Sequence, residues 1–140
     1  MENFVKIIPK HHIYIVDDAQ YAEKIKQSLH NKFGEEVFVS IFHDAESSVN
    51  ELRKSVDKPQ LAIMDYSKNS RVGNEKGEYI VDLIQKISPE TGILILSDEK
   101  HIQPAARVLA HGAHGFVEKD QFALDHINTM VEKCLHPTMM

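Results

Sequence analysis

Short apolar segments rich in β-branched residues alternate along this chain with longer segments in which apolar residues recur every three or four positions. The short segments are typical of strands buried on both faces, and they occupy residues 13–16, 37–42, 61–64, 92–96 and 115–117. The longer segments are typical of helices with one buried face, and their apolar positions are Tyr21/Ile25/Leu29, Val49/Leu52/Val56, Ile80/Leu83/Ile84/Ile87, Ile102/Ala106/Leu109 and Leu124/Ile127/Val131/Leu135. The alternation predicts repeated strand and helix units.

Strands of this kind, joined by helices, form a parallel sheet covered on both faces, because each right-handed crossover places its helix on one face or the other. The sequence therefore predicts an open α/β sandwich of five strands and five helices. A chain of 140 residues can bury one sizeable core but not two, so we expect a single domain. Within it we expect a leader at residues 1–10, a long loop at residues 67–76, a tail at residues 137–140, and helix N-caps at Asp44 and Asp120.

Charge and cysteine content narrow the class of protein. The chain has 16 Lys and Arg against 21 Asp and Glu, a formal net charge of −5, which does not favour binding to nucleic acid. No long apolar run follows the N-terminal residues, and the single Cys134 cannot form an internal disulfide. We therefore expect a cytoplasmic protein that is neither secreted nor inserted into a membrane.

Histidine is frequent, with nine residues. His11 and His12 fall at the start of the first predicted strand, and His111 and His114 flank a turn at Gly112. Their spacing is not that of a known metal motif, so we expect surface histidines rather than a structural metal site.

Polar residues follow four of the predicted strands, at the edge where ligands bind to open parallel sheets. Asp17 and Asp18 follow the first strand, Asp65 the third, Ser97 the fourth and Lys119 the fifth. With the strand order 2-1-3-4-5 the first and third strands are neighbours, which brings the three aspartates into one crevice. Carboxylates so close repel one another unless a cation neutralises them, and Mg²⁺ suits an oxygen-rich site of this kind.

Such a site is suited to phosphoryl chemistry. An aspartate can attack phosphorus and form an acyl phosphate, while Mg²⁺ and Lys119 offset the charge on the transferring group. Ser97 can donate a hydrogen bond to a phosphoryl oxygen. Each residue alone is more often a solvated loop residue or a helix cap, and Asp18 is well placed to cap the helix that follows it. Suitable residues at the ends of four strands are hard to assign to chance.

The chain resembles the receiver domain of bacterial response regulators, the CheY-like family, from about Lys10 to His136. The resemblance rests on the segments at residues 15–18, 61–65, 93–97 and 112–119, which read IVDD, LAIMD, ILILS and GAHGFVEK. It implies a flavodoxin-like (βα)5 fold, a doubly wound parallel sheet with the strand order 2-1-3-4-5. It also implies a protein that is not an enzyme but assists its own phosphorylation and dephosphorylation.

The resemblance assigns a role to each of these residues. Asp65 is the phosphoacceptor, and Mg²⁺ is held by Asp18, Asp65 and the backbone carbonyl of Ser67, with Asp17 acting through water. Two further residues bind the phosphoryl group, Ser97 through its hydroxyl and Lys119 through its ammonium. Phe116 is the aromatic rotamer switch. The phosphoryl donor is a histidine kinase or a phosphotransfer protein, and the output is a contact with a downstream protein.

Three features depart from the family pattern. The segment after Asp65 lacks the usual Met-Pro pair and is several residues longer than is common, and Asp98-Glu99 follow Ser97 where small residues are frequent. Asp120 replaces the usual Pro after Lys119. A cis peptide bond before a residue other than Pro costs about 3 to 4 kcal/mol, so a trans bond is expected at this position.

Three functions fit these observations. The first is a stand-alone receiver that signals through protein contacts, because too few residues follow Lys119 for an output module beside the last helix. The second is an adaptor with the same fold that binds its partners without phosphate, which the departures suggest. The third is a phosphohydrolase of the haloacid-dehalogenase kind, disfavoured because no second aspartate stands two positions after Asp65.

Overall fold

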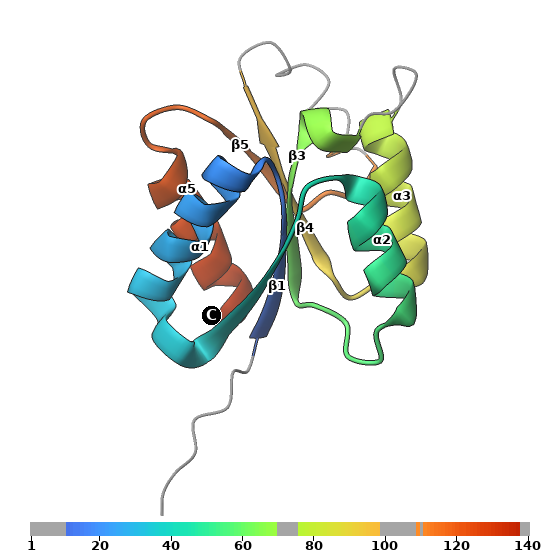
Figure 1. Cartoon of the computed structure of the whole chain (residues 1–140), viewed down its shortest axis with the longest axis horizontal. Helices are drawn as coiled ribbons and strands as arrows, with labels where there is room; N and C mark the ends of the chain where they lie inside the picture. Colours follow the sequence, from blue (N-terminus) through green and yellow to red (C-terminus); the bar gives the residue numbers. More distant parts are fainter. Residues whose placement is uncertain (1–10, 70–75, 99–108, 110, 138–140) are drawn as a thin grey trace, which may run out of the picture.

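The computed structural model describes residues 11–69, 76–98, 109 and 111–137, which form a parallel sheet with helices on both faces (Figure 1). The strands are β1 (His11–Val16), β2 (Val37–Phe42), β3 (Leu61–Asp65), β4 (Gly92–Ser97) and β5 (Gly115–Glu118). The helices are α1 (Ala19–Phe33), α2 (Ala45–Lys54), α3 (Lys76–Ile87) and α5 (Ala123–Leu135), with short 3-10 helices η1 (Gly34–Glu36) and η2 (Tyr66–Asn69). The helix expected around residues 102–109 falls outside the described residues, apart from Leu109, as do the expected leader and most of the tail.

The strand order is β2-β1-β3-β4-β5, and every neighbouring pair is parallel, which confirms the predicted topology. In the register of the central strands, Ile15 of β1 lies opposite Ile63 of β3, which in turn lies opposite Leu94 of β4. The carboxyl ends of β1 and β3 are therefore adjacent. This is the position at which the strand order reverses and at which such sheets bind ligands.

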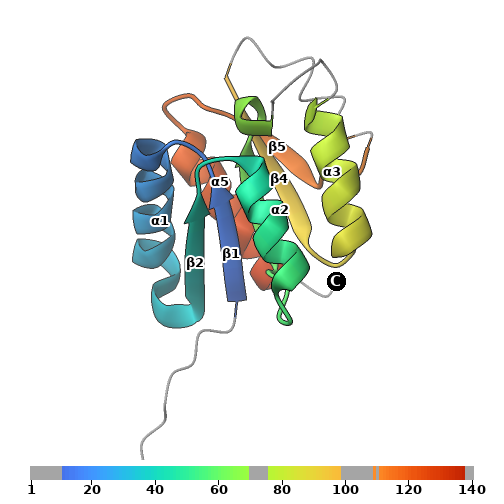
Figure 2. The same ribbon diagram turned by 45° about the vertical axis from the view of Figure 1, so that its right-hand side comes forward.

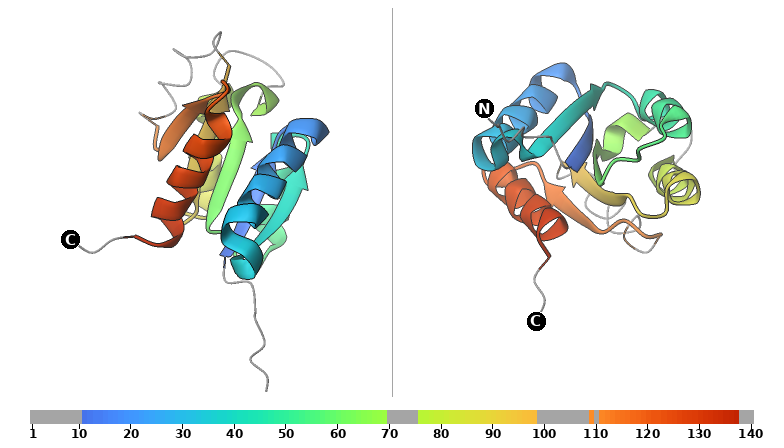
Figure 3. Two further views of the ribbon diagram at one scale, coloured as in Figure 1. Left: turned by 90° about the vertical axis from the view of Figure 1, so that its left-hand side faces the viewer. Right: turned by 90° about the horizontal axis from the view of Figure 1, so that it is seen from below.

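Alternate residues of the strands supply two apolar cores, one on each face of the sheet. Helices α1 and α5 pack on one face and α2 and α3 on the other, as the turned view and the view from below show (Figures 2 and 3). The first face buries Ile13, Ile15, Leu61, Ile63, Leu94, Leu96 and Val117. The opposite face buries Tyr14, Val16, Ala62, Met64, Ile93 and Ile95. The continuous apolar runs in the sequence reflect this burial on both faces.

Two of the helices begin at an aspartate that caps them. Asp18 Oδ1 accepts a hydrogen bond from the backbone N–H of Tyr21 at 2.9 Å, and Asp44 Oδ1 accepts one from that of Ser47 at 2.7 Å. Each carboxylate satisfies a backbone donor that has no partner within its helix, an arrangement worth about 1 kcal/mol. The cap predicted at Asp44 is confirmed.

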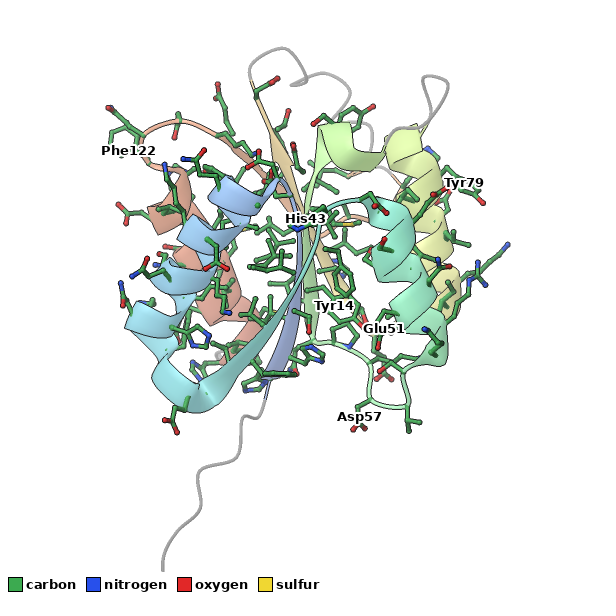
Figure 4. All side chains as sticks on the ribbon, viewed as in Figure 1. Tyr14, His43, Glu51, Asp57, Tyr79 and Phe122 are labelled. Atoms are coloured by element: carbon green, nitrogen blue, oxygen red, sulfur yellow. The ribbon has the colours of Figure 1, made fainter. Side chains whose placement is uncertain are left out.

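The cap predicted at Asp120 is wrong. Helix α5 begins at Ala123, and its N-cap residue Phe122 makes no side-chain capping bond. Asp120 instead accepts a hydrogen bond from the backbone N–H of Phe122 at 2.8 Å, so its carboxylate shapes the turn that precedes the helix. Phe122 itself projects from this turn with 53% of its surface exposed (Figure 4). The peptide bond between Lys119 and Asp120 is trans, as expected, because the described residues contain no cis bond.

The segment after β3 is also more regular than expected. Helix η2 occupies residues 66–69 and α3 already begins at Lys76, so both ends of the loop expected at residues 67–76 are helical. Residues 70–75 lie outside the described part of the chain. Among the helices that are described, none is long and apolar enough to cross a membrane.

Gly34 ends α1 with a backbone conformation that other residues rarely adopt, φ 60° and ψ −134°. A Cβ added there would meet no atom within 4 Å, so a substitution tests the backbone alone. We expect Gly34→Ala to lower the free energy of unfolding by about 1 to 2 kcal/mol, measured by urea denaturation. The neighbouring exposed Glu35→Ala is the control and should change it by less than about 0.5 kcal/mol. Equal stability of the two variants would contradict the assignment of strain to Gly34.

Candidate functional site

The carboxyl ends of β1, β3, β4 and β5 meet at the upper edge of the sheet in Figure 1. Of the residues singled out in the sequence, this edge brings together Asp17, Asp65, Ser67 and Lys119 by direct contact. Asp18, Ser97 and Phe116 lie on the same strand ends or next to them, but their side chains have other partners.

Asp17 is a fully buried carboxylate at the end of β1, and Lys119 is its countercharge. Lys119 Nζ lies 2.8 Å from Asp17 Oδ2 and donates to Oδ1 at 3.1 Å. The backbone N–H of Asp18 donates to the same Oδ1 at 2.7 Å. Burial raises the pKa of Asp17, and the hydrogen bond from Lys119 opposes that rise. For Lys119, burial disfavours the ammonium, but the contacts with Asp17 and Asp65 outweigh it and raise its pKa.

Asp65 completes the group from the neighbouring strand. Its side chain is 11% exposed, and Oδ2 accepts a hydrogen bond from Ser67 Oγ at 2.8 Å. Lys119 Nζ lies 3.4 Å from the same oxygen. Lys119 therefore bridges Asp17 and Asp65, and the repulsion between these two acids is offset by one ammonium.

Tyr21 was expected only in the buried stripe of α1, but its ring lies at this site. Lys119 Nζ lies over its ring, 4.4 Å from the centroid, a cation–π contact that holds the ammonium from the side of the helix. Its position three residues after Asp18, in the first turn of α1, is the only signal in the sequence that could have indicated this role. His43, at the carboxyl end of β2, was also missed, and its Nδ1 lies 3.2 Å from the Asp17 carbonyl (Figure 4).

Three of the remaining candidate residues have other contacts. Asp18 caps α1 through Oδ1, as described above. Ser97 is fully buried, and its hydroxyl donates to the carbonyl of Asp98 at 2.9 Å. Its own carbonyl accepts from the Lys119 N–H at 2.8 Å, which fixes Lys119 beside the end of β4. Phe116 is half-buried and packs against the apolar core on the α2 and α3 side of the sheet.

The donor set at this edge fits Mg²⁺ by its chemistry, because Asp17, Asp18, Asp65 and the Ser67 carbonyl offer only oxygen ligands. Asp17 Oδ2 is buried and receives no hydrogen bond of good geometry, although the ammonium lies beside it. In this structure the carboxylates of Asp17, Asp18 and Asp65 do not lie close enough together to bind one ion in common. Within the described residues, the only group of three or more acidic, His or Cys side chains with ligand atoms inside 4.8 Å of one another lies at the opposite edge of the sheet.

Comparisons with known proteins agree with this geometry. A family model described as the response regulator receiver domain matches residues 13–132. No curated protein matches the chain in sequence.

Solved structures with the same fold include the receiver domain of NtrX from Brucella abortus, at 22% identity and a TM-score of 0.73 over 91% of this chain and 99% of that one. NtrX from the same organism in complex with ATP is similar at 22% identity and a TM-score of 0.71, covering 89% of this chain and 26% of that one, so this chain spans about a quarter of the longer protein. The phosphorylated cyanobacterial phytochrome response regulator RcpA is similar at 13% identity and a TM-score of 0.71, covering 92% of this chain and 96% of that one.

Removing Lys119 should destabilise the fold, because Asp17 would remain buried beside Asp65 without a cation. We expect Lys119→Met to lower the free energy of unfolding by about 2 kcal/mol or more, measured by urea denaturation without divalent ions. Adding Asp17→Asn to this variant should recover much of the loss, whereas Lys133→Met, at an exposed position on α5, should change little. If the changes in the free energy of unfolding caused by Lys119→Met and Asp17→Asn were simply additive, the ion pair would not be a source of stability.

Proposed function

The chain belongs to the response regulator receiver domain family, and we propose that it accepts a phosphoryl group on Asp65 from a histidine kinase or a phosphotransfer protein. The transfer depends on Mg²⁺, and the phosphorylated chain signals through contact with a downstream protein. Neither nucleic acid nor a membrane is a direct partner in this proposal. A donor of this kind places the reaction in the cytoplasm.

The bridging position of Lys119 is the observation that carries the proposal. Asp65 lies at the carboxyl end of a central strand with 7% of its surface exposed, so one of its oxygens can reach a donor. Lys119 Nζ, 3.4 Å from Asp65 Oδ2, is a fixed cation beside the position that a phosphoryl group on this carboxylate occupies. A cation fixed in advance stabilises the charge of the transferring group without reorganisation.

In the transfer step, a carboxylate oxygen of Asp65 attacks the phosphorus of a phosphohistidine. The new bond joins Asp65 to phosphorus, the bond between phosphorus and the imidazole nitrogen breaks, and that nitrogen takes up a proton as the imidazole leaves. Lys119 then pairs with the phosphoryl oxygens in addition to Asp17. Ser67, which donates to Asp65 Oδ2 at 2.8 Å, orients the carboxylate before the attack.

Asp18, Asp65 and the carbonyl of Ser67 would hold Mg²⁺, with Asp17 acting through water. The bound ion supplies positive charge to the phosphoryl oxygens during the transfer. Asp18 caps α1 through Oδ1, so its carboxylate serves the helix and the proposed ion together.

The readout of phosphorylation depends on Ser97 and Phe116. The Ser97 hydroxyl donates to the uncharged carbonyl of Asp98, and a phosphoryl oxygen is a stronger, charged acceptor. We expect the turn of this hydroxyl toward the phosphoryl group to rearrange the end of β4, which pairs along its length with β5, Ile95 lying opposite Phe116. The phosphoryl group thereby shifts the population of conformations on the surface around β5 and α5 that contacts the partner.

A second candidate function is a receiver-fold adaptor that binds its partners without phosphate. It is favoured by the positions of Asp18 and Lys119: the first caps α1 and the second already pairs with both Asp17 and Asp65. If the Lys119 ammonium occupies the position beside these carboxylates, a metal ion is not required there. The two functions differ in whether Mg²⁺ and a phosphoryl group bind.

Phosphorylation should occur once per chain and depend on Asp65. Incubation with acetyl phosphate and Mg²⁺, followed by intact-mass measurement, should show one added phosphoryl group on the wild-type chain and none on Asp65→Asn. Asp57→Asn, at an exposed position between α2 and β3, is the matched control and should react like the wild type (Figure 4). If acetyl phosphate fails, the same comparison is made with a histidine kinase as donor. An adduct that persists in Asp65→Asn would sink the proposal, and no adduct from any donor would favour the adaptor.

Magnesium binding separates the two functions independently of the phosphoryl donor. Isothermal titration should show one Mg²⁺ bound with a millimolar or tighter dissociation constant, weakened at least tenfold in Asp18→Asn because one charged ligand is lost. Asp44→Asn keeps a helix-capping residue on α2 and is the control, with no change in affinity expected. Absence of binding in the wild type would support the phosphate-independent adaptor.

A further inference from the structure

A second cluster of ligating side chains lies at the opposite edge of the sheet from Asp65. It combines His11 at the start of β1, Glu36 at the end of η1 and His136 at the C-cap of α5. These three side chains place one ligand atom each within 4.8 Å of one another, although the chain separates Glu36 from His136 by 100 residues. In Figure 1 the cluster is at the lower edge, where β1 begins and α5 ends.

The distance between two of the ligand atoms, His11 Nε2 and Glu36 Oε2, is close to that in a tetrahedral metal centre. Bonds of about 2.0 to 2.1 Å from Zn²⁺ to nitrogen or oxygen place neighbouring ligand atoms roughly 3.4 Å apart. His11 Nε2 lies 3.6 Å from Glu36 Oε2, and His136 Nε2 contacts the same oxygen. The His11 and His136 rings stand nearly perpendicular, at 83°, with their centroids 6.4 Å apart. Because His136 Nε2 contacts Glu36 Oε2 directly, an ion between them requires the half-exposed His136 side chain to move.

The surroundings of the two histidines also fit a metal site. His136 Nδ1 lies 2.7 Å from Glu132 Oε2, so this carboxylate orients the ring from behind, as outer carboxylates do for metal-bound histidines. The His11 side chain is only 15% exposed, its Nδ1 is buried without a hydrogen-bond partner among the described residues, and its Nε2 is beyond hydrogen-bond distance of Glu36. The Nε2 atom of His11 therefore faces Glu36 without a hydrogen bond to it, and an ion bound between these two atoms would give that nitrogen a partner.

We propose that His11, Glu36 and His136 bind a divalent ion of the Zn²⁺ class, with Glu132 orienting His136 and the remaining position open to water. Two imidazoles and one carboxylate favour Zn²⁺ and related transition metals over Mg²⁺, which prefers oxygen ligands. The ion fastens the end of α5 to the starts of β1 and β2. This site is independent of the function proposed at Asp65. It revises the expectation that His11 is a surface residue.

The test is isothermal titration of the full chain, without a polyhistidine tag, with ZnCl₂ in a buffer that contains millimolar Mg²⁺. We expect one Zn²⁺ per chain, and at least tenfold weaker binding in each of His11→Gln, Glu36→Gln and His136→Gln. His126→Gln, at an exposed position on α5 remote from the cluster, and Asp18→Asn, at the other edge of the sheet, should bind like the wild type. Circular dichroism of each variant without metal shows whether it is folded, and the exposed His136 is the position least expected to affect folding.

Two further readouts make the result decisive. Co²⁺ should give the visible absorption of a tetrahedral nitrogen and oxygen site in the wild type but not in His136→Gln, and Zn²⁺ should raise the melting temperature of the wild type but not that of His136→Gln. Equal Zn²⁺ affinity in the wild type and His136→Gln would overturn the proposal. So would equal weakening in His126→Gln, or no binding by the wild type at micromolar concentrations.

Discussion

The contact of Lys119 with Asp17 and Asp65 is the constraint on which the rest of this structure depends. A fully buried carboxylate such as Asp17 is costly unless a countercharge accompanies it, and Lys119 is that countercharge. The ammonium arrives from the last strand, 102 residues along the chain, so the pair forms only when β1, β3, β4 and β5 are all in register. The ion pair between Lys119 and Asp17 therefore depends on the strand order, and it stabilises that order in turn. A phosphoryl group on Asp65 would enter an arrangement whose cation is already in place.

Much of the fold could be predicted because burial on both faces leaves a direct trace in the sequence. Runs such as Ile93 to Leu96 contain only apolar residues, and a sheet covered by helices on both faces buries all of them. The polar residues that end these runs then fall on one edge of the sheet, whatever the details of the loops. This is why Asp17, Asp65 and Lys119 could be expected together from their positions alone.

The parts that could not be predicted depend on side-chain choices between competing partners. Asp120 could cap a helix or stabilise a turn. Because α5 begins only at Ala123, the Asp120 carboxylate binds within the preceding turn. Ser97 follows its strand as expected, but its hydroxyl bonds to the adjacent Asp98 carbonyl, a local option that sequence spacing does not reveal. Tyr21 and the cluster of His11, Glu36 and His136 depend on contacts between segments distant in the chain. No short motif marks the cluster, and the position of Tyr21 three residues after Asp18 does not by itself show that its ring meets Lys119.

The central claim is that Asp65 carries the phosphoryl group. Borohydride reduces an aspartyl phosphate to homoserine, so treatment of the phosphorylated chain, followed by peptide mass spectrometry, identifies the acceptor directly. We expect homoserine at position 65 and unmodified aspartate at positions 17 and 18. Homoserine at either of those positions, or a phosphoryl group that resists reduction and maps to Ser67 or Ser97, would contradict it.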